Sequence, residues 1–170
     1  MKTPICYFCA KSGVLCPRCQ EKKDKGEISD TDVEVSKWFI DYEAKNPQLK
    51  DYLIQKTVQV GRMVIIMVGG GGTANRQLLT KMSKQLSDDK RCSIRMVEKT
   101  SSIKRLLEQI VTPARVMGAN TVWLPDGSWE STVRIPRNDL RKMPLEPKQA
   151  EEAIKQLTGE VIHIVFEPVL

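Results

Sequence analysis

Four cysteines near the start of the sequence have the residue type and the spacing of a metal site. Cys6 and Cys9 are separated by two residues, and so are Cys16 and Cys19. Each Cys-x-x-Cys turn can offer two thiolates to one ion, and two such turns complete the tetrahedron that zinc prefers. Because four cysteine ligands leave no position for water or substrate, the spacing predicts one structural Zn²⁺ per chain.

Two disulfides or a redox-active dithiol are the alternatives for the same four cysteines. A reducing cytosol disfavours disulfides, and no βαβ pattern surrounds the motifs as it would in a thioredoxin-like protein. Basic residues around the ligands, among them Lys11, Arg18 and Lys22, most often form only a solvated surface. Zinc knuckles dock both RNA and other proteins, and the sequence does not separate these uses. Cys92 lies far away in a strand pattern and is expected to be a small buried residue.

A run of four glycines, residues 69–72, is the second motif that could bind a ligand. It follows the apolar residues 63–68, which predict a buried strand, and it precedes an amphipathic helix that Thr73 could cap. Bare backbone N–H groups at a helix N-terminus, beside basic side chains, suit a phosphate. The candidate RNA-binding residues are Gly69, Gly70, Gly71, Gly72, Thr73, Asn75, Arg76, Lys81 and Lys84.

The spacing of these glycines separates the kinds of phosphate loop. A mononucleotide loop needs Gly-x4-Gly-Lys-Ser/Thr and a dinucleotide loop needs Gly-x-Gly-x-x-Gly, and neither pattern is present. A Gly-x-x-Gly turn is what a KH domain uses to hold the backbone of about four nucleotides. In such a turn we expect Gly69 or Gly72 to need φ > 0, and Gly70 and Gly71 to tolerate side chains.

Two other interpretations of the glycine run remain open. A flexible turn without a ligand gives the same pattern. A nucleotide-dependent enzyme could also use the glycines, but the sequence lacks a Walker lysine, a paired catalytic carboxylate motif and a nearby histidine. A non-catalytic protein is therefore expected.

Composition favours a basic protein that binds a polyanion. The chain has 170 residues, 41% of them hydrophobic, a net charge of +6 and a pI near 9.1. It has neither a signal peptide nor a run long enough to span a membrane, so a cytoplasmic protein is expected. Three Phe, three Tyr and three Trp are too few to stack many bases, so phosphate contacts should dominate. Further cations expected to contact phosphate are Arg91, Arg95, Lys104 and Arg105.

The remaining pattern predicts two similar α/β units after the cysteines. In the first, we expect a linker at 22–27, a helix capped near Ser29 and running to Lys45, and a short helix from Pro47 that includes Tyr52 and Leu53. Strands at 57–60 and 63–68, the glycines, a helix to 90, a strand at 92–97 and a helix at 101–111 follow. The second unit has a hairpin at 116–135, a helix at 147–157 and a strand at 161–166, but residues 135–144 contain no glycine.

Over roughly residues 50–167 the chain resembles the tandem KH domains of archaeal NusA-like proteins. The resemblance lies in residues 68–75 with the helix after them, in the strand at 94–98 and in the helix at 103–111 with its Pro-Ala-Arg-Val exit. It departs from that pattern in three ways: no basic residue stands inside the glycine clamp, the helix before the clamp is missing, and the second clamp is lost. The resemblance implies RNA binding and a role in transcription elongation and termination with RNA polymerase.

These observations predict an α+β protein in three parts. Residues 1–26 form a four-cysteine zinc knuckle with a basic linker, residues 27–112 a helical lead-in and a type II KH-like domain, and residues 113–170 a degenerate KH-like domain. The expected function is non-catalytic RNA binding in archaeal transcription. The alternative is a protein of the small ribosomal subunit bound to its rRNA.

Overall fold

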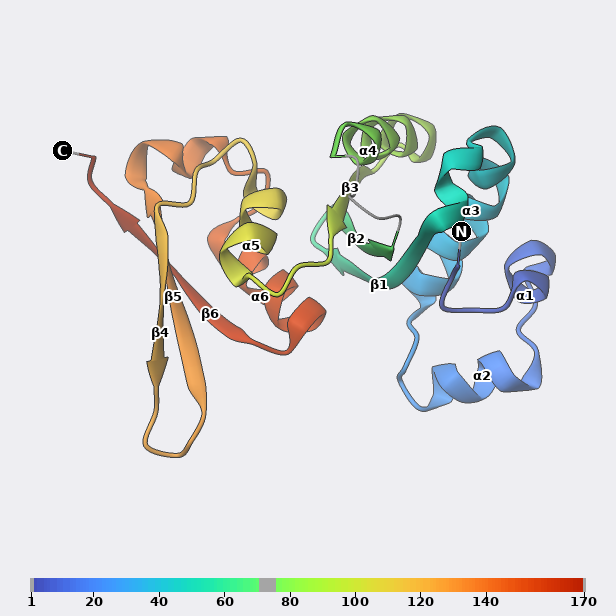
Figure 1. The fold of residues 1–170 in the computed structure, drawn as a ribbon, viewed down its shortest axis with the longest axis horizontal. Coiled ribbons are helices and arrows are strands. Elements are labelled where there is room, and N and C mark those ends of the chain that lie inside the picture. Colours follow the sequence, from blue (N-terminus) through green and yellow to red (C-terminus); the bar gives the residue numbers. More distant parts are fainter. Residues whose placement is uncertain (1, 71–75, 170) are drawn as a thin grey trace.

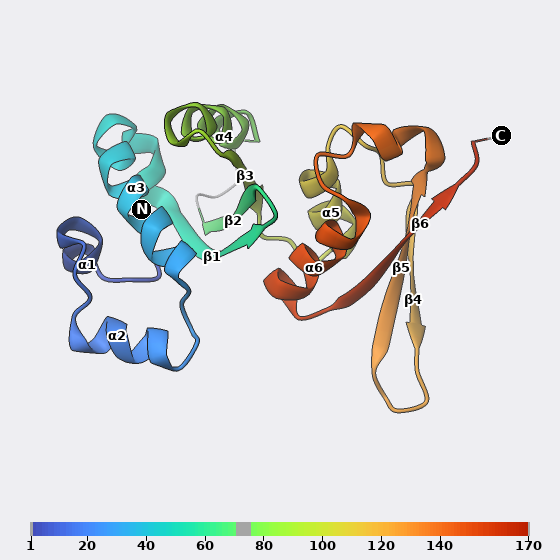
Figure 2. The same cartoon turned by 180° about the vertical axis from the view of Figure 1, so that it is seen from behind.

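The computed structural model describes residues 2–70 and 76–169 and shows an α+β protein with a four-cysteine knuckle followed by two α/β units (Figures 1 and 2). Each unit has the order helix, strand, strand, helix, strand. The knuckle and the second unit lie at opposite ends of the molecule, with the first unit between them. In the part of the chain described, no helix is long and apolar enough to cross a membrane.

The knuckle consists of two short helices, α1 (Tyr7–Ser12) and α2 (Pro17–Asp24). The prediction of a linker from residue 22 was wrong, because α2 continues to Asp24. Pro17 is the first residue of this helix. The carboxylate of Glu21 accepts a hydrogen bond from Lys25 Nζ, one turn further along the chain, at 2.6 Å. These local contacts extend a helix that charge composition alone does not reveal.

The first unit contains α3 (Asp30–Lys45), the 3₁₀ helix η1 (Pro47–Asp51), β1 (Tyr52–Val60), β2 (Met63–Gly70), α4 (Arg76–Lys90) and β3 (Ser93–Glu98). The predicted start of α3 is confirmed: Ser29 and Asp32 form a reciprocal capping box. Asp32 is also buried and accepts hydrogen bonds from the backbone N–H and hydroxyl of Thr57, at 2.9 and 2.7 Å. The cap of α3 is thereby joined to strand β1.

The first sheet has the order β1-β2-β3, with β1 antiparallel and β3 parallel to β2. Tyr52 and Leu53, which we predicted to be helical, are the first residues of β1, because they pair with Gly70 and Gly69 at the end of β2. Gly69 and Gly70 therefore extend the ladder.

Both faces of this sheet are buried, which explains the unbroken apolar run in β2. Val64, Ile66 and Val68 belong to a core with α3 and α4 on one face. Ile65 and Met67 belong to a second core on the other face, with residues of α5 and α6. A central strand covered on two sides shows no polar alternation.

The second unit contains α5 (Ile103–Val111), β4 (Gly118–Trp123), β5 (Trp129–Pro136), the 3₁₀ helix η2 (Arg137–Lys142), α6 (Pro147–Thr158) and β6 (Val161–Glu167). The sheet order β4-β5-β6 repeats that of the first unit, as the pattern predicted. Leu106, Leu107 and Ile110 of α5 lie in the core that the two units share. The predicted boundary at residue 113 lies just after α5, and α5 packs against residues of both units.

The 3₁₀ helix η2 occupies the place of a second glycine clamp. It contributes the buried Asp139, which accepts hydrogen bonds from Lys142 Nζ at 2.7 Å and from Nε and the backbone N–H of Arg115 at 3.0 and 3.1 Å. The Lys142 and Arg115 donors hold the pKa of the Asp139 carboxyl well below its usual range. Asp139 thereby joins the segment before β4 to the segment after β5 by hydrogen bonds.

Candidate functional site

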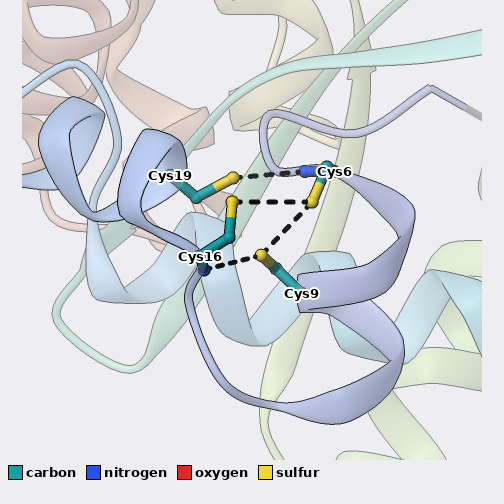
Figure 3. Close-up of side chains that lie close together, drawn as sticks. All are labelled: Cys6, Cys9, Cys16 and Cys19. Atoms are coloured by element: carbon teal, nitrogen blue, oxygen red, sulfur yellow. Dashed lines mark hydrogen bonds between the residues drawn. The ribbon is translucent and has the colours of Figure 1, made fainter.

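The four predicted cysteine ligands come together at the facing ends of α1 and α2 (Figure 3). Their sulfur atoms all lie within 4.8 Å of one another, with Cys6 Sγ 3.2 Å from Cys9 Sγ and 4.0 Å from Cys16 Sγ. Zinc–thiolate bonds of about 2.3 Å give a tetrahedron whose sulfur–sulfur edges are about 3.8 Å. The cluster therefore has the size that such a metal ion needs.

Each Cys-x-x-Cys motif starts a helix in the same way. Cys6 and Cys16 are the N-cap residues of α1 and α2, and Cys9 and Cys19 lie in the first turns. The two motifs also support each other: the backbone N–H of Cys16 donates to Cys9 Sγ at 3.0 Å, and that of Cys6 to Cys19 Sγ at 3.5 Å (Figure 3). Amide donors and helix N-termini both stabilise thiolates, so this arrangement suits charged ligands.

The thiols of the metal-free cluster differ in acidity. A hydrogen bond from the Cys19 backbone N–H, together with the neighbouring thiols, lowers the pKa of Cys16 to about 7, and the Cys9 N–H lowers that of Cys6. The Cys16 N–H also favours the thiolate of Cys9, but burial and the three other thiols outweigh it and raise the pKa of Cys9 to about 12. Burial raises the pKa of Cys19. Four thiolates this close need a cation to be stable together.

The knuckle is attached to the first unit by apolar contacts and by a short β-bridge. Ile5 and Ile28 are buried with Cys9 and Cys19, and Val33 and Ile40 of α3 pack against them. Lys2 pairs with the outer edge of β1, where its backbone accepts from and donates to the strand at 2.9 and 3.0 Å. The four cysteines are thus positioned to bind a metal ion such as zinc, and Cys92, half-buried beside the α3–α4 core, is not among them.

The glycine run is placed differently from our expectation. Gly69 and Gly70 are the last residues of β2, and Gly70 has φ +80 while its missing Cβ would lie 2.7 Å from the carbonyl oxygen of Asp51. Gly70 is therefore the glycine that conformation requires, and the prediction that it tolerates a side chain was wrong. Four further candidates, Gly71, Gly72, Thr73 and Asn75, lie outside the described residues.

A groove of about 660 Å³ is lined by residues of α4 and β3, of the end of α5 and of the segment that follows α5. Its charged and polar lining includes Arg76, Thr80 and Ser83 of α4, Arg95 of β3, Glu108 of α5 and Arg115. These residues thus include three arginines and one acidic residue, Glu108. Arg76 is the first residue of α4, so the groove reaches the N-terminal end of this helix.

The cations predicted to contact RNA fall into separate groups. Arg76 lines the groove, whereas Lys81 and Lys84 are exposed on α4 outside its lining. Arg95 has a structural role as well, since its Nη1 donates to the backbone carbonyls of Gln109, Ile110 and Thr112 at the end of α5, at 3.1, 2.8 and 2.8 Å. Burial lowers the pKa of Arg95, yet an arginine stays charged at neutral pH.

Sequence reasoning missed Arg115 and the groove itself. Arg115 was seen only as part of the exit from a helix, and its place with Arg76 in the lining of one groove depends on how the two units pack. No local pattern reports a distance between segments forty residues apart. His163, the single histidine of the chain, is exposed, and its Nε2 lies 3.1 Å from Glu130 Oε2.

Comparison with known proteins leaves the family open. No protein-family model matches the chain, and no curated protein matches it. A solved structure described as "Crystal structure of APE1850" is 16% identical, with an alignment that covers 75% of this chain and 96% of that one and a TM-score of 0.48. Similarity of this degree identifies neither a family nor a function.

Proposed function

We propose that this chain is a non-catalytic RNA-binding protein of the NusA-like KH type, with a structural zinc ion in its knuckle. RNA phosphates would enter this groove, whose lining includes Arg76 at the start of α4 and Arg115 in the segment after α5. The observation that carries the proposal is this groove, because it joins an arginine-rich lining to the helix end that follows the glycine run.

The net charge of +6 supports the same proposal, since a basic chain attracts a polyanion over the whole surface. A groove with three arginines can hold phosphates without reading bases. The small number of aromatic residues agrees with binding through the RNA backbone. Zinc would hold the knuckle together through Cys6, Cys9, Cys16 and Cys19 and would take no part in chemistry.

The experiment is a fluorescence anisotropy titration of a labelled single-stranded oligouridine RNA at several salt concentrations. Each phosphate contact on a single strand should add about 0.7 to the slope of log affinity against log salt. Arg76→Glu should weaken binding at fixed salt at least tenfold, about 1.4 kcal/mol, and should reduce the slope. Glu at the first residue of α4 suits the helix dipole, so the variant should stay folded.

Lys148→Glu is the matched control. It makes the same change of charge in the first turn of α6, on an exposed residue outside the groove lining. The proposal predicts that this variant binds RNA almost as well as the native chain. Equal losses in the two variants would indicate diffuse attraction and no groove, and a salt slope near zero would remove RNA binding altogether.

The role in transcription is proposed from the resemblance to archaeal NusA-like proteins. Co-elution of the chain with RNA polymerase would support it. Sedimentation with small ribosomal subunits in high salt would favour the alternative, in which the bound RNA is rRNA. High salt matters here because it removes basic proteins that are held only by long-range attraction.

A further inference from the structure

The β4–β5 hairpin differs in charge from the rest of this basic chain. Residues 116–133 contain no Lys and no Arg, and their only ionisable groups are the carboxylates of Asp126 and Glu130. Both views show the hairpin projecting beyond α5 and α6 (Figures 1 and 2). A projecting arm with two negative charges repels phosphate, so it does not fit the RNA-binding role proposed for the groove.

Two tryptophans stand together near the end of this arm. Trp123 and Trp129 are paired across the ladder, with ring centroids 6.2 Å apart and an interplanar angle of 44°. Trp123 is 72% exposed and Trp129 37% exposed, and Val122 beside them is 54% exposed. Exposed tryptophans are costly in water and are enriched among the residues that dominate the energy of protein interfaces.

The outer edge of β4 is open to pairing. β4 is the terminal strand of its sheet, and among the described residues β5 is the only strand that pairs with it. Natural edge strands are commonly protected by charged residues, proline or a bulge. β4 (Gly118–Trp123) has neither charge nor proline, and its ladder with β5 is regular from end to end.

We propose that the edge of β4 and the Trp123–Trp129 pair bind an extended, Lys- and Arg-rich segment of a partner protein. The segment would add to the sheet through backbone hydrogen bonds, as in other cases of strand addition. Alternate side chains of an added strand lie on the same face as Trp123, where a cation can sit over the indole rings. Asp126, in the turn that follows Trp123, supplies the complementary charge on this side, whereas Glu130 lies on the other face of β5 and contacts His163 at 3.1 Å.

The same charges argue against two other occupants. RNA would bring phosphates toward two carboxylates, and residues 116–133 contain no Lys or Arg to offset them. Arg134, the cation of β5, lies at the base of the hairpin opposite Gly118 and pairs with Glu167 of β6 at 3.5 Å. A second copy of this chain, paired edge to edge, would add two more carboxylates and, from its residues 116–133, no Lys or Arg. A basic protein segment is the occupant that suits the carboxylates, the exposed tryptophans and the open strand edge together.

The test is an NMR titration of the isotope-labelled full chain with a ten-residue peptide of alternating Arg and Val. The indole signals of Trp123 and Trp129 should shift, while that of Trp38, half-buried against the α3–α4 core, should not. Backbone amides of β4 should exchange more slowly with solvent, because the edge becomes paired. Trp123→Ala should weaken binding of the peptide at least tenfold, and Asp126→Asn should weaken it in the same direction.

Phe8→Ala is the matched control, because Phe8 is an aromatic residue 67% exposed on α1, at the far end of the molecule. This variant should bind the peptide as the native chain does. Each of four results would overturn the proposal: no shift with the peptide, equal shifts with a Glu–Val peptide, the same shifts with oligouridine, or concentration-dependent shifts without any peptide. The last two would identify RNA or a second copy as the occupant. The RNA titration with Arg76→Glu is independent of all of them.

Discussion

Removal of the metal should unfold the knuckle and leave the two α/β units folded. In small zinc domains the metal contributes about 10–16 kcal/mol of apparent folding free energy. The apolar contacts of the knuckle are much weaker, since burying Ile5 and Ile28 contributes about 1.5–3 kcal/mol each. The cores of the two units contain no cysteine ligand, so they should not depend on the ion.

Trypsin digestion before and after chelation measures this effect site by site. Lys11 and Arg18 are exposed but lie in or beside helices whose first turns are fixed by the cysteines, so cleavage there should become rapid only in the metal-free protein. Lys148 should stay resistant in both forms. Metal analysis should find one zinc per chain, and Cys9→Ser should reproduce the chelated pattern.

Two results would refute this reasoning. If the metal-free knuckle stays resistant at Lys11 and Arg18, apolar packing alone is sufficient to fold it. If chelation also melts the remaining helices, the knuckle is part of the main core and the contacts through Val33 and Ile40 are stronger than their partial burial implies.

Three further predictions concern buried polar groups and backbone strain. Asp32→Ala should destabilise the protein by about 1.5–3 kcal/mol in urea unfolding, because the buried donors of Thr57 lose their charged acceptor, whereas exposed Asp30→Ala should have little effect. Gly70→Ala should cost about 1–3 kcal/mol, since φ is +80 and a backbone carbonyl blocks the new methyl group; a smaller change would mean that the strand end relaxes. Asp139 has a depressed pKa, so its contribution should be complete above about pH 4, where the unfolded group ionises, and should be lost as the pH falls further; Asp139→Asn should abolish that part of the pH dependence in thermal melts.

Signals within short segments predicted most of the fold. The cap near Ser29, the helix predicted at 147–157 and the strand predicted at 161–166 each depend on residues a few positions apart, and the structure confirms these elements. The four-cysteine cluster was predictable for the same reason, because its ligands lie within fourteen consecutive residues, Cys6 to Cys19.

Features that depend on tertiary packing were not predictable in this way. The strand character of Tyr52 follows from pairing with Gly70, eighteen residues later, and local propensity does not contain that information. No local pattern marks Asp32 and Asp139 as buried, yet both are buried and accept hydrogen bonds from distant donors. The groove brings Arg76 and Arg115 into one lining, which only the packing of the two units determines.

The distribution of charge suggests why one small chain keeps two such different surfaces apart. Arg76, Arg95 and Arg115 line a groove between the units, while Asp126 and Glu130 lie on an arm that points away from the helices. Attraction between exposed charges is screened beyond about 8–10 Å at physiological salt, so the arm weakens RNA binding little if it stays clear of the groove. A basic protein segment on the arm and RNA in the groove would then be bound at the same time, and neither surface would compete for the ligand of the other.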